Sequence, residues 1–133
     1  MPLNIESNLS PELDRLAYAV IGAAIEVHKH LGPGFLENVY EVALCHELEL
    51  RSIKYERQKP IRVAYKTIEI DGQRLDLIIE GVMIVELKTV DTIAPIHEAQ
   101  LLSYIKSAKI PLGLIINFKV TLLKKGGIKR MVL

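Results

Sequence analysis

Three charged residues in one stretch of predicted strands could form a site for a hard metal cation. Asp76 precedes Glu86 by nine intervening residues, and Lys88 follows two positions later in the stretch VMIVELKTV. Two carboxylates side by side repel one another unless a cation lies between them. Oxygen ligands without cysteine or converging histidine favour Mg²⁺ or Mn²⁺ over zinc. Such an ion polarises a phosphoryl oxygen and acidifies a water while Lys88 stabilises negative charge, which suits phosphodiester hydrolysis.

The turn at Glu80-Gly81 decides whether the two carboxylates share a sheet face. A two-residue loop would place Asp76 opposite Val85 and send Glu86 to the other face, whereas a three-residue loop or a bulge brings Asp76 and Glu86 together. Outside the turn, the odd positions between residues 75 and 87 are all apolar, and an unpaired charge buried there costs several kcal/mol. We therefore predict the longer loop, with one face forming core and the other carrying charge.

Hydrophobic periodicity predicts two helices at the start of the chain. Ser10-Pro11-Glu12 is typical of a helix start, because serine caps the first turn and proline is tolerated at the first helical position. Apolar residues then recur every three or four positions until Gly32-Pro33-Gly34. A second helix is expected over roughly residues 36–51.

The next segment predicts a meander of three or four antiparallel strands. Between residues 55 and 88 the apolar period becomes two, and Asp71-Gly72 and Glu80-Gly81 are expected to be turns. These strands contain all three charged residues of the candidate site.

A third helix and a buried strand are expected after the meander. Pro95 suits the first turn of a helix over residues 95–108, and the strand over residues 112–118 has the two-sided apolar character of a central strand. The tail could add a short hairpin through Gly126-Gly127 to Val132. The predicted fold class is α/β, with an α+β mixed sheet flanked by helices.

Composition limits the broad class of the protein. The 133 residues fit a single domain over residues 1–133, with a flexible terminus expected over residues 1–9. The net charge of +1 gives no global field that would attract a polyanion or a membrane. Cys45 is the only cysteine, the first residues lack a signal-peptide pattern, and no apolar run reaches the ~18 residues of a membrane span. We expect a cytoplasmic protein without a membrane partner.

Three motifs together resemble a known superfamily. Asp76, followed after nine residues by Glu86-Leu87-Lys88, resembles the D…ExK signature of the PD-(D/E)XK nuclease superfamily. The segment Gly34 to Tyr40, GFLENVY, fits the motif of the GxxExxY protein family within that superfamily. Gln100 to Tyr104, QLLSY, resembles the QxxxY motif of the RecB-type branch. The likeness covers about residues 13–133, and it implies a restriction-endonuclease-like αβββαβ core with an extra N-terminal helix.

The resemblance implies a role for each matching residue. Asp76, Glu86 and the backbone carbonyl of Leu87 would bind the catalytic metal, and Glu37 would add a carboxylate from a helix. Leu75 precedes Asp76 where the signature has proline, a departure that the superfamily tolerates widely.

Three further residues of the motifs would act on water or substrate. By the same resemblance, Lys88 would position or activate the attacking water, and Gln100 and Tyr104 would orient the lysine or the substrate. By spacing alone, Gln100 and Tyr104 would be an ordinary polar edge of a helix.

The basic tail and one histidine are candidates for contact with substrate phosphates. His97 could contact a phosphate or form a structural hydrogen bond. The basic residues near the C-terminus could bind phosphates non-specifically or form a solvated end, and the candidates are Lys124, Lys125, Lys129 and Arg130.

The leading functional hypothesis is a nuclease that uses Mg²⁺ or Mn²⁺ to hydrolyse nucleic acid, with DNA as the expected substrate. The alternative is a catalytically silent nuclease-fold module that binds nucleic acid or a protein partner, because a fold does not fix a function. A single module of this size rarely wraps a duplex, so a homodimer is one arrangement to test.

Overall fold

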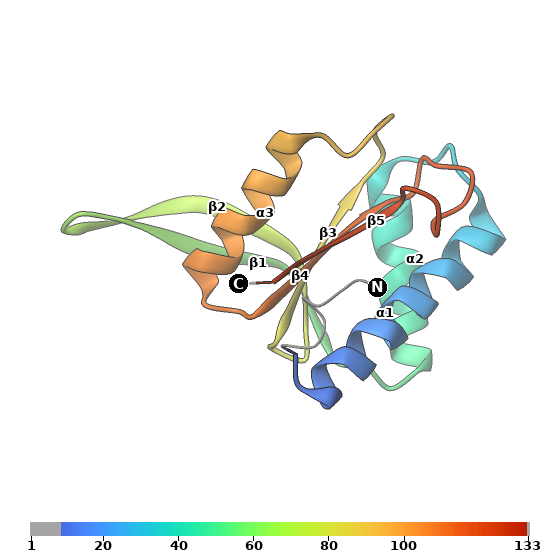
Figure 1. The fold of residues 1–133 in the computed structure, drawn as a ribbon, viewed down its shortest axis with the longest axis horizontal. Coiled ribbons are helices and arrows are strands. Elements are labelled where there is room, and N and C mark those ends of the chain that lie inside the picture. The colour runs from blue at the N-terminus through green and yellow to red at the C-terminus, as the bar shows by residue number, and fades with distance from the viewer. Residues whose placement is uncertain (1–8, 133) are drawn as a thin grey trace.

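Within residues 9–132, the part of the chain that the computed structural model describes, three helices accompany one five-stranded mixed sheet (Figure 1). This confirms the predicted fold class. The expected flexible terminus lies almost wholly outside the described residues. The elements are α1 (Pro11–Leu31), α2 (Glu37–Leu50), β1 (Tyr55–Tyr65), β2 (Ile68–Ile79), β3 (Met83–Lys88), α3 (Pro95–Ala108), β4 (Leu112–Asn117) and β5 (Ile128–Val132).

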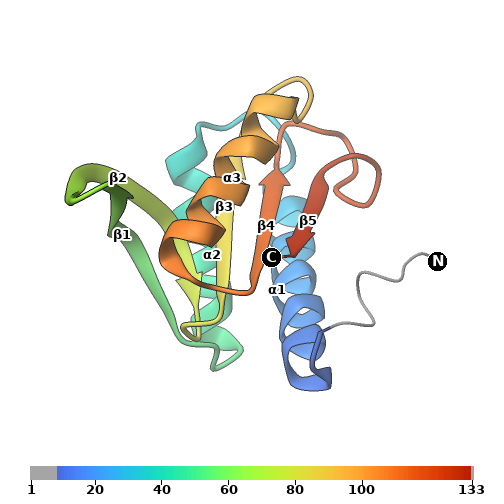
Figure 2. The same cartoon turned by 60° about the vertical axis from the view of Figure 1, so that its left-hand side comes forward.

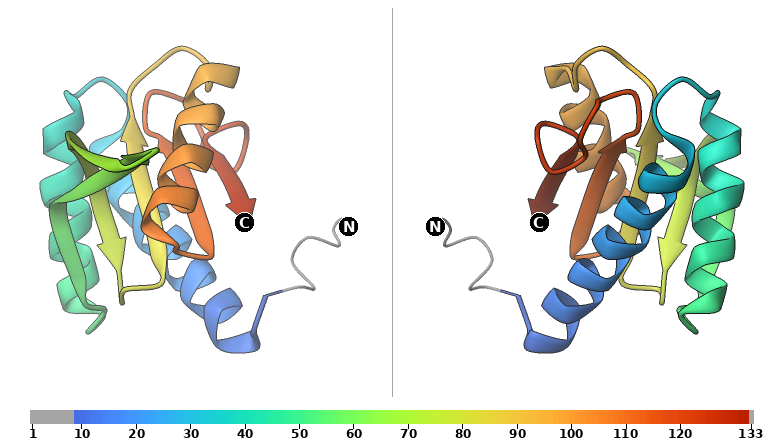
Figure 3. Two further views of the ribbon diagram at one scale, coloured as in Figure 1. Left: turned by 90° about the vertical axis from the view of Figure 1, so that its left-hand side faces the viewer. Right: turned by 90° about the vertical axis from the view of Figure 1, so that its right-hand side faces the viewer.

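The sheet separates two hydrophobic layers. Its strand order is β1-β2-β3-β4-β5, with β3 and β4 parallel and the other neighbours antiparallel. Helices α1 and α2 cover one face and α3 covers the other (Figure 3). The central strands β3 and β4 are buried along nearly their whole length. Two-sided burial explains why the sequence of β4 is apolar at successive positions.

The first helix begins as its sequence predicts. The Ser10 side chain accepts a hydrogen bond from the Leu13 amide at 3.1 Å, and Pro11 occupies the first helical position. The second helix is one residue shorter at each end than predicted, at Glu37–Leu50.

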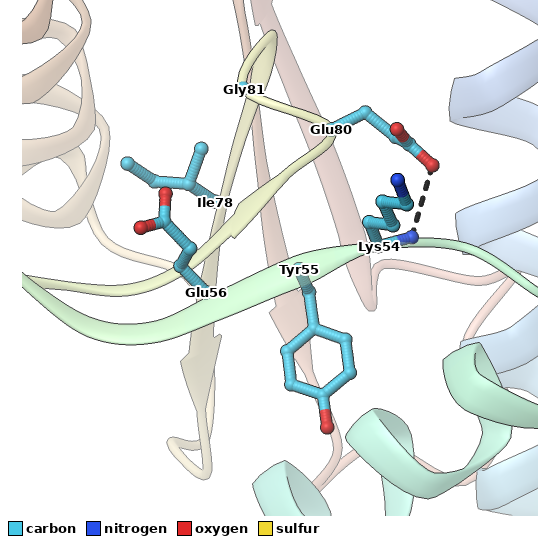
Figure 4. Close-up of a pocket in the computed structure, with 6 residues that line it drawn as sticks. All are labelled: Lys54, Tyr55, Glu56, Ile78, Glu80 and Gly81. Atoms are coloured by element: carbon cyan, nitrogen blue, oxygen red, sulfur yellow. Dashed lines mark hydrogen bonds between the residues drawn. The ribbon is translucent and has the colours of Figure 1, made fainter.

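A three-residue loop joins β2 to β3, as predicted. Leu77 pairs with Val85 and Ile79 pairs with Met83, so Asp76 lies opposite Glu86. Glu80 and Gly81 both have positive φ, at 52° and 73°. Figure 4 shows the Glu80 carboxylate accepting a hydrogen bond from the backbone amide of Lys54 at 3.0 Å, beside a pocket of about 370 Å³. The Glu80 amide in turn donates to the Lys54 carbonyl at 2.9 Å, which ties the turn to the start of β1.

The predicted turn at Asp71-Gly72 is wrong. Strand β2 runs through these residues without ending, and the hairpin between β1 and β2 closes at Lys66-Thr67 instead. The β1–β2 register shifts between Ile61 and Val63, where Asp71 and Gly72 of β2 lie opposite Arg62 alone, which marks a bulge on β2 at Asp71-Gly72. The φ of Gly72 is 114°, which suits a bulge in a strand as well as a turn.

The prediction of one core face and one charged face is also wrong, because both faces of the sheet pack against helices. Leu75 packs with the α3 layer, whereas Leu77 packs with the layer of α1 and α2. Ile78 and Ile84, on the face assigned to charge, are also buried under α3. The β1–β2 hairpin leaves the body of the sheet (Figure 1), since β2 pairs with β3 only from Leu77 to Ile79, and two-stranded ribbons twist strongly. Within the paired part of β2 and β3, the charged residues of that face lie at the end beside Asp76.

Replacing Gly81 tests the turn that sets the register. Gly81→Ala forces a β-carbon into the left-handed region and should destabilise the protein by about 1–2 kcal/mol. Urea unfolding followed by circular dichroism measures the change. Gly22→Ala is the matched control, because Gly22 lies inside α1 and its new methyl group would meet only the end of the Arg51 side chain at 3.3 Å. It should be neutral or stabilising, and equal destabilisation by both variants would contradict the assignment.

Candidate active site

Asp76 and Glu86 lie in the fork where β2 leaves β3. The last regular pair of the two strands is Leu77–Val85, so the next backbone amides lose their ladder partners. The Asp76 amide donates to Glu86 Oε2 at 2.9 Å, and the Leu87 amide donates to Asp76 Oδ2 at 2.9 Å. Each carboxylate therefore accepts a backbone hydrogen bond from the opposite strand. This exchange holds two acids side by side and leaves each with a second oxygen.

The Glu86 carboxyl has a raised pKa. Its side chain is buried, and burial together with the charge of Asp76 raises its pKa to about 8. The hydrogen bond from the Asp76 amide and the charge of Lys88 act in the opposite direction. Without a cation, the surroundings do not stabilise two negative charges on the pair, so Glu86 keeps its proton at neutral pH.

Lys88 is positioned by the ends of two parallel strands. It lies two residues beyond Glu86, about 6.6 Å along the strand, and it is half-buried. Its carbonyl accepts a hydrogen bond from the Phe118 amide at 2.9 Å. The fully buried Asn117 donates to the Val90 carbonyl at 2.8 Å and accepts from the Val90 amide at 3.1 Å. Asn117 therefore fixes the chain that leaves β3, a role that its sequence position did not reveal.

The residues of the GFLENVY segment form a locked turn at the start of α2. Tyr40 is fully buried and stacks on Phe118 with ring centroids 4.4 Å apart. Its hydroxyl donates to the Gly32 carbonyl at 2.5 Å and accepts from the Phe35 amide at 3.2 Å. Gly34 has a φ of 120°, which other residues rarely adopt. The turn places Glu37 at the first position of α2, within electrostatic range of Asp76 and Lys88.

Glu37 is an electrostatic neighbour of the carboxylate pair. Desolvation and the charge of Asp76 raise its pKa, while Lys88 lowers it. Within residues 9–132, however, no three side chains of His, Cys, Asp or Glu lie close enough together to hold a metal ion. The structure therefore brings Asp76 and Glu86 together and leaves Glu37 near them, without forming a three-acid cluster.

Tyr104 approaches the same carboxylates from α3. Desolvation and the charge of Glu86 raise its pKa, and a hydrogen bond with Gln100 opposes that rise. Its hydroxyl donates to Gln73 Oε1 on β2 at 3.0 Å. Gln73 is a contact that the sequence pattern did not indicate. Tyr104 thus lies within electrostatic range of the fork, with Gln100 beside it on α3.

The predicted phosphate-binding residues do not form one patch. Arg130 contacts Asp14 at 3.1 Å and lies over the Tyr18 ring, on the α1 face. Lys129 pairs with Glu98 at 3.8 Å, on the α3 face. His97 accepts a hydrogen bond from the Ala94 amide at 2.9 Å, which stabilises the start of α3.

The two remaining lysines of the tail are exposed near the end of the sheet that carries Lys88. Lys124 and Lys125 are exposed in the segment 118–127, beyond the ends of β3 and β4 (Figure 2). This is the end of the sheet at which Lys88 lies.

Comparison with protein families shows the superfamily of the chain. A family model described as the PD-(D/E)XK nuclease superfamily matches residues 14–131. The chain belongs to this superfamily. No curated protein and no solved structure gives a significant match. None of the helices formed by residues 9–132 is both long and apolar enough to cross a membrane.

Nucleases of this superfamily generally depend on a divalent metal, and the donor set of the fork suits one. Asp76, Glu86 and the carbonyl of Leu87 supply only oxygen ligands, which Mg²⁺ and Mn²⁺ prefer. Mg²⁺ commonly uses one or two carboxylates, with waters and substrate phosphates completing its shell, so a third acid is not required. A cation here would also offset the repulsion that raises the pKa of Glu86.

The pKa of Glu86 predicts how stability depends on pH in the metal-free protein. The folded carboxyl retains its proton up to pH about 8, whereas the unfolded one loses it near 4.5. The folded state binds more protons in this window, so stability should fall by up to about 4 kcal/mol as pH rises from 5 to 8.5. Urea unfolding in EDTA measures the slope. Glu86→Gln should remove most of it, and an unchanged slope in this variant would contradict the assignment.

Removing one hydroxyl tests the turn that carries Glu37. Tyr40→Phe keeps the ring stacked on Phe118 but leaves two backbone groups without their partner, so it should destabilise the protein by about 1–3 kcal/mol. Thermal unfolding measures the loss. Tyr65→Phe, at the exposed tip of the hairpin, is the control and should change nothing. Equal stability of both variants would show that the hydroxyl does not lock the turn.

Proposed function

We propose that the protein is a cytoplasmic, divalent-metal-dependent nuclease of the GxxExxY type. The observation that carries this proposal is the reciprocal hydrogen bonding of Asp76 and Glu86 in the β2–β3 fork, with Lys88 on the same strand as Glu86. The locked turn from Gly34 to Tyr40 supports the GxxExxY assignment. A free, buried Cys45 fits a reducing compartment.

The roles of the residues follow from charge and position. Asp76, Glu86 and the Leu87 carbonyl would hold Mg²⁺ or Mn²⁺, which when bound polarises the phosphoryl oxygen and acidifies water. Lys88 orients the attacking water and stabilises negative charge that develops on the phosphate. Glu37 is exposed and within electrostatic range of Asp76 and Lys88, and its carboxylate would accept a hydrogen bond from that water.

The substrate path runs along α3. A pocket of about 360 Å³ lies between the β1–β2 hairpin and α3, and it includes Gln73, Gln100 and Tyr104. Val63 and Ile70 contribute an apolar wall, so the pocket can receive a nucleotide next to the fork. Lys124 and Lys125 would contact phosphates beyond the strand ends, and DNA is the substrate to test first. A second copy of the chain could contact the part of a duplex that one copy does not cover.

Cleavage of labelled nucleic acid tests the proposal. The purified protein is incubated with single- and double-stranded DNA and RNA in Mg²⁺, Mn²⁺ or EDTA, beside Lys88→Ala and Asp76→Ala. We expect metal-dependent cleavage that falls at least 100-fold in both variants. Cleavage that persists equally in both points to a contaminant, and binding without cleavage in any metal supports the silent module.

The effect of metal on stability gives a second prediction. Asp76→Asn keeps an acceptor for the Leu87 amide but removes one of two repelling charges. Without metal, this variant should be as stable as the wild type or more stable. Mg²⁺ should raise the melting temperature of the wild type only, as binding to the folded state requires. Marked destabilisation of the metal-free variant would instead support a structural ion-pair cluster.

A further inference from the structure

Gln58 has a backbone conformation that is rare within a strand. Its neighbours Arg57 and Lys59 pair regularly with Leu77 and Leu75, so Gln58 lies opposite Asp76. Its φ is +49°, in the left-handed region. A residue with a β-carbon adopts this conformation at a cost, and it persists where the surroundings impose it. The irregularity thus occurs at the one position of β1 that faces a site carboxylate.

The side chain of Gln58 connects two carboxylates. Its Nε2 donates to Glu41 Oε1 at 3.1 Å and to Asp76 Oδ1 at 3.4 Å. Only the amide nitrogen can face two acids, because the amide oxygen is an acceptor. The contact to Asp76 is long for a hydrogen bond. The two N–H groups of this nitrogen face three oxygens, because Glu41 Oε2 also lies at 3.4 Å.

Glu41 anchors this bridge to α2. Its side chain is buried and accepts a hydrogen bond from Arg57 Nε at 3.0 Å, so its charge is compensated. Glu41 lies one helical turn after Glu37, on the same side of α2. Asp76 is thereby linked through Gln58 to the helix that carries Glu37.

The Gln58 amide that bridges Glu41 and Asp76 carries no charge. An arginine or lysine opposite Asp76 would orient the carboxylate but would also neutralise it, and so would compete with a metal cation. An amide orients the carboxylate and leaves its negative charge in place. Partners of this kind, one step removed from the metal, typically change metal affinity 10- to 100-fold when they are removed.

We propose that Gln58 is a positioning residue that holds the Asp76 carboxylate in its metal-binding orientation. This inference rests on the proposed function, because it requires that Asp76 bind a divalent metal. Asp76 Oδ2 is fixed by the Leu87 amide and Oδ1 by Gln58, so the plane of the carboxylate is set by two donors. Gln58 itself touches neither metal nor substrate.

Two substitutions at Gln58 separate positioning from stability. Gln58→Gly removes the amide and relieves the left-handed φ, so its melting temperature should equal or exceed that of the wild type. Gln58→Ala removes the amide and retains the unfavourable φ, so it should melt lower. Both should weaken Mn²⁺ binding about 10-fold or more, measured by isothermal titration calorimetry, and lower kcat with little change in KM for DNA.

Controls make the outcome decisive. Ser52→Gly, at a φ of 59° in the turn before β1, relieves the same kind of strain and should leave Mn²⁺ affinity unchanged. Wild-type Mn²⁺ affinity in Gln58→Gly, while Asp76→Ala loses binding, would overturn the positioning role and leave the metal site intact. If metal affinity follows melting temperature across the Gln58 variants, the role is merely structural. If the wild type itself fails to bind Mn²⁺, both this inference and the proposed metal site are wrong.

Discussion

Two carboxylates occupy the places of the strand hydrogen bonds that end where β2 leaves β3. Asp76 and Glu86 accept the two backbone amides exposed by the fork, each from the opposite strand. This arrangement satisfies donors that would otherwise be unpaired, but it forces two acids together in a poorly solvated place. The raised pKa of Glu86 is the consequence. The fork therefore has a structural reason to contain acceptors and an electrostatic reason to bind a cation.

Four features of the rest of the fold maintain this geometry. The three-residue turn closed by Glu80 and Gly81 sets the β2–β3 register. The Tyr40 lock brings α2 and Glu37 to one side of the fork, and α3 brings Tyr104 to the other. Asn117 holds the chain beyond Lys88. The candidate site is thus formed where elements that are far apart in the sequence meet at the end of two central strands.

The sequence predicted the features that arise from local patterns. Ser10 and the apolar periodicity predicted the limits of the helices. The cost of burying charge on an apolar face predicted that Asp76 lies opposite Glu86. The bulge at Asp71-Gly72 was mistaken for a turn because a glycine with positive φ serves both. Contacts between distant side chains have no local signal, so the bridge through Gln58 and the scattering of the basic tail emerge only from the structure.

The proposed function requires that the fork bind a divalent cation between Asp76, Glu86 and the Leu87 carbonyl. The most direct measurement is an anomalous difference map from crystals soaked in Mn²⁺. We predict a peak within about 2.0–2.3 Å of one oxygen from each of these three groups. A map with no peak in the fork at saturating Mn²⁺, or with manganese bound only elsewhere, would contradict the account.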